Sequence, residues 1–177
     1  MANNLLVVIG AGTLGTGAMT AACRSLAEVF GATLMEQTSD AAPHPCLQGI
    51  TSRSTDGPLE PKLLRVSGDV AVDECGEGSW LEALACWHVP VLMLVEPRDD
   101  GRFAGIVPAS VALARSLHVE LLGLVQLGGT WNRAARRADG LPWCGCLQGA
   151  DDDLCGLISC LRTRWTQVAR GEGADPA

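Results

Sequence analysis

The feature that most constrains the fold is an apolar run near the start of the chain, Leu5–Ile9, which leads directly into a turn rich in glycine. A strand that is apolar at every position must be covered on both faces, which is typical of parallel sheets with helices on each side. The turn, residues 10–17, reads G-A-G-T-L-G-T-G, and an amphipathic helical pattern follows it as far as Gly31. A strand, a glycine-rich turn and a helix in this order predict an α/β domain.

The rest of the chain continues the alternation of strand-like and helical runs. It predicts one α/β domain over residues 1–170, with a mainly parallel sheet and helices on both faces. Further strands are expected at 32–36, 69–73, 89–95, 120–126 and 141–147, and further helices at about 79–87, 103–118, 131–139 and 154–168. Residues 38–62 are rich in Pro, Ser, Thr, Asp and Gly and predict an irregular excursion, and residues 171–177 predict a flexible tail.

Composition and charge exclude several classes of partner. Apolar residues make up 47% of the chain, so it can bury a core. The net charge of −7 argues against a surface that binds nucleic acid or anionic membranes. No apolar run is long enough for a signal sequence or a membrane span, so we expect a soluble cytoplasmic protein with no membrane or nucleic-acid partner. The chain has a single lysine, Lys62, which is the one candidate for lysine-dependent phosphate chemistry.

The glycine turn (residues 10–17) is the first candidate binding site, because backbone N–H groups and the positive end of the helix dipole both favour phosphate there. Gly10, Gly12 and Gly15 satisfy the G-x-G-x-x-G pattern of Rossmann domains, and Glu36 stands where an acid that binds a ribose is expected. This interpretation predicts an NAD(P)-binding oxidoreductase. A turn that is rich in glycine only for tight packing is the alternative without a ligand.

The same turn also satisfies the G-x-x-x-x-G of a P-loop, with Gly10 and Gly15 as its glycines. A P-loop continues with Lys and then Ser or Thr, whereas this chain has Thr16 and Gly17. Thr16 cannot place a positive charge on a phosphate, and Gly17 has no hydroxyl for Mg²⁺. The P-loop pattern is therefore incomplete.

Four later segments follow the order of the motifs in one P-loop family. Asp69–Gly78 is similar to a strand followed by Glu-Gly-x-Gly-Gly, and Val89–Val95 to x-Pro-Val-Ile-Leu-Val. Val119–Gln126 is similar to Leu-x-Gly-Val-Val-x-Asn, and Gly140–Leu147 to Gly-x-Pro-Val-Leu-Gly-x-Ile-Pro. Together with the turn, these segments resemble the family of dethiobiotin synthetase and the related cobyrinate amide-synthesising enzymes over about residues 5–149. The resemblance implies the three-layer sandwich of P-loop NTPases, with ATP or another nucleotide and Mg²⁺ as cofactors. If the chain is an enzyme, it implies an ATP-dependent ligase or synthetase.

Residue by residue, the resemblance implies a degenerate Walker A motif. The family's P-loop lysine falls at Thr16 and its Ser/Thr metal ligand at Gly17, while Thr13 keeps a hydroxyl within the turn. The family's acid after the strand falls at Asp73 or Glu74, which are the expected catalytic and metal-binding residues. The expected cofactor-binding residues are Gly10, Gly12, Thr13, Gly15, Thr16 and Gly17.

The main hypothesis is a divergent dethiobiotin-synthetase-like protein that binds a nucleotide or another small phosphorylated ligand through the glycine turn. We expect it to lack efficient ATP hydrolysis and to act as an accessory or regulatory subunit. An NAD(P)-binding Rossmann oxidoreductase and a non-catalytic interaction protein remain as alternatives. A homo-oligomer or a protein partner is left open.

Three other groups carry two interpretations each. Asp73 and Glu74 either hold Mg²⁺ or precede a helix that Ser79 caps. The arginines at 133–137 either grip a phosphate or form a solvated helix face. The eight cysteines are expected to be buried structural thiols, with a thiolate metal site near the end of the chain as the alternative.

Overall fold

The computed structural model describes residues 4–12, 14–52, 60–149 and 154–169. Six strands form one sheet, and all of them are parallel. The strands are β1 (Leu5–Gly10), β2 (Thr33–Thr38), β3 (Lys62–Ser67), β4 (Val91–Val95), β5 (Leu121–Leu127) and β6 (Trp143–Leu147). The helices are α1 (Thr16–Phe30), α2 (Pro43–Ser52), α3 (Trp80–Cys86), α4 (Ile106–Ser116), α5 (Arg133–Ala138) and α6 (Leu154–Ala169). The predicted α/β class with a parallel sheet is confirmed.

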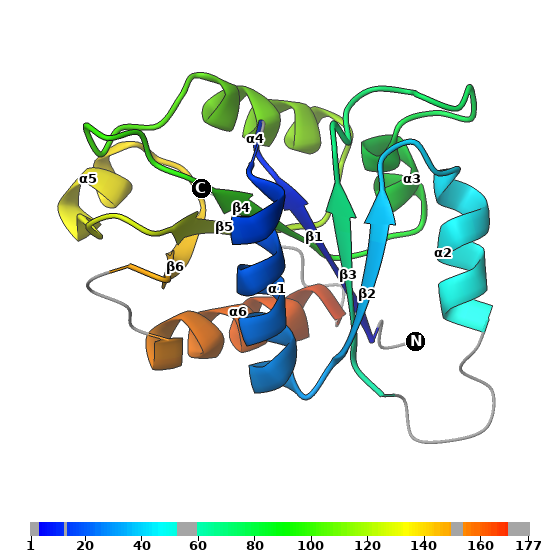
Figure 1. Cartoon of the computed structure of the whole chain (residues 1–177), viewed down its shortest axis with the longest axis horizontal. Helices are drawn as coiled ribbons and strands as arrows, with labels where there is room; N and C mark the ends of the chain where they lie inside the picture. The colour runs from blue at the N-terminus through cyan, green and yellow to red at the C-terminus, as the bar shows by residue number, and fades with distance from the viewer. Residues whose placement is uncertain (1–3, 13, 53–59, 150–153, 170–177) are drawn as a thin grey trace.

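The helices cover both faces of the sheet, which gives three layers. Alternate residues of β1 point to opposite faces, as a strand requires. Leu6 and Val8 pack with α1 and α6, whereas Val7 and Ile9 pack with α2, α3 and α4. In Figure 1, α1 lies in front of the sheet, and α4 lies at the top of the view, above β4 and β5.

The strand order is β2-β3-β1-β4-β5-β6. From β1 the chain first builds the sheet on one side, through β2 and β3, and then crosses to the other side for β4, β5 and β6. The topological switch point therefore lies between β1 and β4. A Rossmann sheet, in the order 3-2-1-4-5-6, places its second strand beside the first. Here β3 takes that place, and β2 is at the edge.

Two predicted elements differ from the structure. Residues 69–73 form turns and bends rather than a strand, and the strand is β3, which begins at Lys62. The expected irregular excursion at 38–62 contains α2, whose Pro43 occupies the first helical position, where a missing N–H is tolerated. The expected flexible tail at 171–177 lies outside the described residues. Within the described ranges, no helix combines the length and the apolar character needed to cross a membrane.

Candidate functional site

The glycine turn joins β1 to α1 at the switch point of the sheet. The N–H of Ala11 donates to the carbonyl of Leu94 at 2.9 Å, which ties the turn to the end of β4. Gly12 has φ +73°, a conformation that glycine adopts without strain. Gly15 is the N-cap residue of α1 and supplies no side-chain cap, and the first turn of the helix contains no acid. The positive end of the α1 dipole is thus exposed, with no capping side chain and no acid in the first turn to compensate it.

The other predicted turn residues can be placed beside it. Gly12, Gly15, Thr16 and Gly17 are exposed, and Thr13 lies outside the described residues. A Cβ atom at Gly12 would meet Cγ2 of Ile106 at 3.0 Å, because the first residue of α4 lies against the turn. The turn therefore faces the crevice between β1 and the loop that joins β4 to α4. In open α/β sheets, ligands bind in this kind of crevice.

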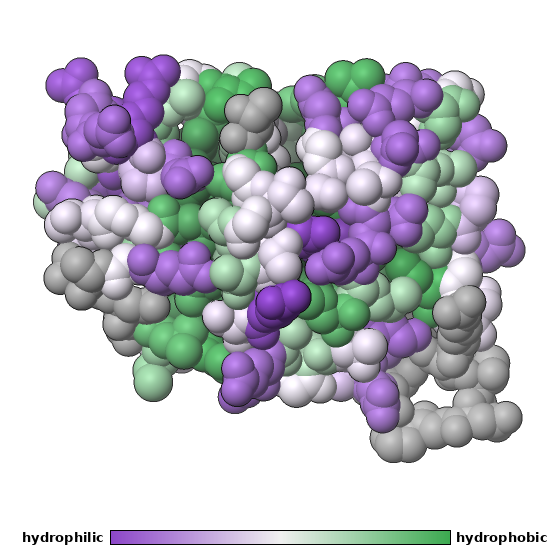
Figure 2. Space-filling view, viewed as in Figure 1, coloured by the Kyte–Doolittle hydropathy of each residue, from purple (hydrophilic) through white to green (hydrophobic). Residues whose placement is uncertain are grey.

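A cavity of about 690 Å³ lies at the carboxyl ends of β4 and β5, next to this crevice in the strand order. Its walls are the loop after β4, residues 96–102, the end of β5 with the loop after it, residues 127–130 and Asn132, and Ala135 and Arg136 of α5. The first loop carries charges of both signs, and Figure 2 shows polar side chains gathered at this corner of the molecule. Gln126 holds the second loop, since its buried side-chain amide donates to the carbonyls of Gly128 and Thr130.

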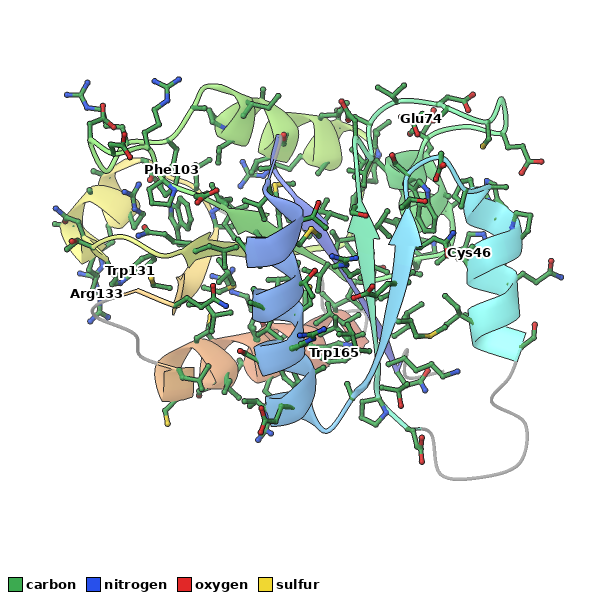
Figure 3. All side chains as sticks on the ribbon, in the orientation of Figure 1. Cys46, Glu74, Phe103, Trp131, Arg133 and Trp165 are labelled. Atoms are coloured by element: carbon green, nitrogen blue, oxygen red, sulfur yellow. The ribbon has the colours of Figure 1, made fainter. Side chains whose placement is uncertain are left out.

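Arg136 ties the wall of this cavity to α5 and β6. Its guanidinium lies 4.2 Å from the ring centroid of Phe103 and 5.1 Å from that of Trp143. It also forms an ion pair with Asp139 at 3.1 Å and donates to the carbonyl of Gly101. Figure 3 shows Phe103 at the same end of the molecule as Trp131 and Arg133. The sequence indicated the arginine cluster but not this aromatic setting, which is assembled from three separate segments.

The two predicted catalytic acids lie in the loop after β3, which leaves the sheet beside β1. Asp73 accepts the N–H of Gly76 at 2.6 Å. Hydrogen bonds from the loop backbone, that of Gly78 first, hold the pKa of this carboxyl below its usual value. Glu74 accepts the hydroxyl of Ser39 at 3.1 Å, and in Figure 3 it lies at the opposite end of the molecule from Phe103.

These hydrogen bonds connect Asp73 and Glu74 to their own loop and to the end of β2, rather than to the glycine turn. Among the residues that the structure describes, no three His, Cys, Asp or Glu side chains gather as metal ligands. The helix-capping interpretation, by contrast, is confirmed at Ser79. Its hydroxyl accepts the N–H of Glu82, and Glu82 accepts the N–H of Ser79 in return.

Glu36, the acid expected to bind a ribose, lies on the outer strand β2, and its side chain forms an ion pair with a residue of the neighbouring strand. Its carboxylate is 3.1 Å from Arg65 of β3, and Arg65 also donates to the hydroxyl of Thr20 on α1. Lys62 lies beside Leu5 at the amino end of β1, whereas the glycine turn follows the carboxyl end. The single lysine of the chain therefore lies at the opposite end of the strands from the glycine turn, where it cannot reach a phosphate bound in the turn.

A second cavity, the arginine groove, has a volume of about 630 Å³ and follows β6, the strand at the edge of the sheet. It is lined by residues of β6, α5 and α6, among them Arg133, Arg137 and Arg164. The prediction that the cysteines are buried is wrong for most of the eight. Cys23 and Cys146 are buried, and Cys75, Cys86 and Cys155 are exposed, while the other three are half-buried. Burial raises the pKa of Cys23 to about 12, so that residue stays a thiol.

Comparison with models of protein families finds no match, and no curated protein is similar enough in sequence to count as a relative.

Proposed function

We propose that the chain binds a nucleotide or another phosphorylated small molecule at the switch point of the sheet, as a divergent dethiobiotin-synthetase-like protein without efficient phosphoryl transfer. One observation carries the proposal: the uncapped glycine turn opens where ligands bind in such sheets, beside a cavity of about 690 Å³. An accessory or regulatory role fits a site that binds without catalysing.

The phosphate would lie against the N-terminus of α1. Thr16 and Gly17 are exposed, and their backbone N–H groups belong to the first turn of a 15-residue helix. The first N–H groups of a helix have no intrahelical acceptor, and the helix dipole adds positive potential at the same place. No acid in the first turn competes for that potential. Backbone groups can thus replace part of the attraction that a P-loop lysine supplies.

The rest of the ligand would extend over β4 and β5. The cavity there has the size of a small-molecule site. Arg98 and Arg102 of its wall offer cationic groups for further phosphates. The residues present do not fit a Mg²⁺ site of the P-loop type, because Gly17 has no hydroxyl and the carboxylates of Asp73 and Glu74 are hydrogen-bonded elsewhere. We therefore expect binding that does not depend on Mg²⁺.

The test is calorimetric titration with ATP, ADP, GTP, NAD and NADP, each with and without Mg²⁺. We expect saturable binding of at least one phosphorylated ligand, equally tight without the metal. In Thr16→Asp the new carboxylate repels phosphate, so affinity should fall about tenfold or more, while the helix gains about 0.5 kcal/mol from its dipole. Ala21→Asp places the same charge at an exposed position of the second turn and serves as the control.

Absence of binding by every member of the panel would refute the proposal. Unchanged thermal stability across the panel, together with a stable oligomer, would favour the interaction protein instead. Mg²⁺-dependent turnover at about 1 s⁻¹ or faster would refute the absence of catalysis. Saturable binding of NAD(H) that is lost in Glu36→Ala would favour the Rossmann alternative. The edge position of β2 and the Glu36–Arg65 ion pair weigh against that outcome.

A further inference from the structure

The arginine groove opens along one edge of the sheet. β6 is the outermost strand, and among the described strands it pairs with β5 alone. The consecutive residues 140–146 all line the groove. Because neighbouring residues of a strand point to opposite faces of the sheet, a groove over one face would be lined by every second residue of β6. The groove therefore follows the outer edge of the strand, where an edge strand offers backbone N–H and C=O groups to a further strand.

The charge of this groove is the reverse of that of the whole chain. Four arginines line it, and no Asp or Glu is among its described lining residues, although the chain has a net charge of −7. Two of the four are engaged, since Arg136 pairs with Asp139 and Arg164 donates to backbone carbonyls. Arg133 and Arg137 are exposed on α5, and neither forms an ion pair or a side-chain hydrogen bond with a described residue. Their guanidinium groups can therefore bind carboxylates of a ligand.

The two sides of β6 offer different surfaces. Trp143 points to the side of α5, where the guanidinium of Arg136 lies 5.1 Å from its ring centroid. Cys144 points to the side of α6 and packs against the core cluster that contains Leu157. Figure 1 shows β6 between these two helices, and Figure 3 shows Arg133 at the end of the molecule where α5 lies. A strand added beside β6 would thus direct its side chains in turn toward the arginines of α5 and toward α6, so its best sequence alternates acidic with apolar residues.

The charge also decides between the possible occupants of the groove. A second copy of the chain, paired edge to edge by two-fold symmetry, would bring the same arginines against these, and like charges repel. A small carboxylate would use the arginines but not the backbone of β6. An extended acidic peptide uses both, because its main chain pairs with the strand while its carboxylates meet the arginines.

We propose that the arginine groove binds an extended acidic segment of a partner protein, which adds to the sheet as a further strand beside β6. Carboxylates at every second position of that segment pair with Arg133 and Arg137, and the residues between them pack toward Leu157. The same positive charge that repels a second copy selects an acidic partner. This site is separate from the one proposed for phosphorylated ligands, so Thr16→Asp should leave its affinity unchanged.

The first experiment locates the binding on the unaltered chain. The probe is an acetylated and amidated peptide of about seven residues in which Glu and Val alternate, which is long enough to span β6. NMR follows the indole N–H resonances of the five tryptophans during the titration. We expect saturable shifts of the two that line the groove, Trp131 and Trp143, and constant positions for Trp80, Trp87 and Trp165. Absence of shifts at about 1 mM peptide, or equal shifts of all five, would overturn the proposal.

The second experiment tests the backbone pairing. The N–H groups of successive residues of a strand point to its opposite edges, so the probe is N-methylated either on all of its Glu residues or on all of its Val residues. Strand addition predicts that one methylated form binds at least about tenfold more weakly than the parent peptide, and that the other form binds nearly as well. Equal effects of the two methylations, or binding of free citrate as tight as that of the peptide, would overturn strand addition.

The third experiment tests the charges. Replacing Arg133 and Arg137 by Ala should weaken binding of the alternating peptide by about tenfold, because two exposed pairs of guanidinium and carboxylate are lost. Replacing Arg24 and Arg115, which are exposed on α1 and α4, is the matched control and should change the affinity by less than about twofold. Equal effects of the two pairs of substitutions would overturn the role of the groove.

Discussion

At the scale of single residues, Gly12 shows how the turn is fixed from outside. It has φ +73°, and Ile106 of α4 occupies the space into which a Cβ atom would project. Both the backbone conformation and the packing therefore require glycine at this position. The G-x-G-x-x-G pattern indicated a glycine here, but the reason for it includes a residue far along the chain, which no local pattern contains.

Gly12→Ala should lower the free energy of unfolding by about 2 kcal/mol, because the new methyl group meets both a left-handed backbone and Ile106. Gly17→Ala is the matched control, since a Cβ atom there meets nothing within 4 Å and the residue is helical. The control should raise stability by about 0.5–1 kcal/mol. Urea unfolding measures both, and equal stabilities would show that α4 does not confine the turn.

Asp73 predicts a dependence on pH. Its folded-state pKa is lowered by backbone N–H groups, so its contribution is complete above the unfolded pKa of about 4 and is lost as pH falls through the folded value. We expect amide exchange at Gly76 and Gly78 to be less protected at about pH 3 than at about pH 6, after correction for intrinsic rates. In Asp73→Asn that difference should shrink. An unchanged difference would contradict the assigned hydrogen bonds.

At the scale of elements, β5 and β6 are joined by a side chain as well as by their ladder. Arg164 of α6 donates to the carbonyls of Leu122, Pro142 and Trp143, at the end where the register of the two strands is irregular. Gly123 leaves the necessary space, since a Cβ atom there would lie 2.5 Å from Nη1 of Arg164. The edge of the sheet thus depends on one helix.

Arg164→Met should lower the free energy of unfolding by about 3 kcal/mol, because carbonyls of both strands lose a charged donor. Arg162→Met, on the exposed side of the same helix, is the control and should change stability by less than about 0.5 kcal/mol. Thermal and urea unfolding compare the two variants. If Arg164→Met destabilises the protein as little as the control does, the aliphatic part of Arg164, which Met preserves, stabilises the edge, rather than the hydrogen bonds of its guanidinium.

The elements that could be predicted from the sequence are those whose apolar pattern is complete. Leu5–Ile9 and 89–95 were correctly predicted to contain strands, because every buried residue there is apolar. The strand β3 was misplaced because Lys62 and Arg65 interrupt its pattern. Arg65 is nonetheless buried, since Glu36 from β2 compensates its charge. That compensation arises only after the strands have paired.

The helix α2 was missed for a different reason, namely that Pro43 and Pro45 read as loop residues although both occupy its first turn. At the candidate site, sequence motifs indicated the glycine turn and the acids Asp73 and Glu74. The α/β fold class indicated that both lie at the carboxyl ends of the strands. The cavity walls and the Arg136 cluster could not be predicted in this way, because each combines segments that are distant in sequence.

At the scale of the whole molecule, α6 completes one of the two cores. Leu157 and Leu161 are buried against the sheet, and the ring of Trp165 lies 5.8 Å from that of Phe30 on α1 (Figure 3 labels Trp165 between these helices). Removal of α6 would expose the apolar residues of β5 and β6 on this face, Leu122, Val125, Leu127 and Leu147.

A chain that ends at Gly149 should therefore fail to fold or should aggregate, because a large apolar surface would face water. A chain that ends at Arg170 keeps α6 and should fold like the full chain. Circular dichroism and size-exclusion chromatography compare the two. A monomeric, cooperatively folded chain without α6 would contradict the importance of this helix for the core.

The strand order has a consequence for how the molecule reaches its native state. Every pair of neighbouring strands is parallel and is joined through a long connection, so no local hairpin can start the sheet. The central strand β1 is made first, yet its second neighbour β4 is complete only at Val95. High contact order of this kind slows folding. During synthesis the apolar run Leu5–Ile9 remains without one of its partner strands until more than half of the chain has been made, and in that interval it is a segment prone to aggregation.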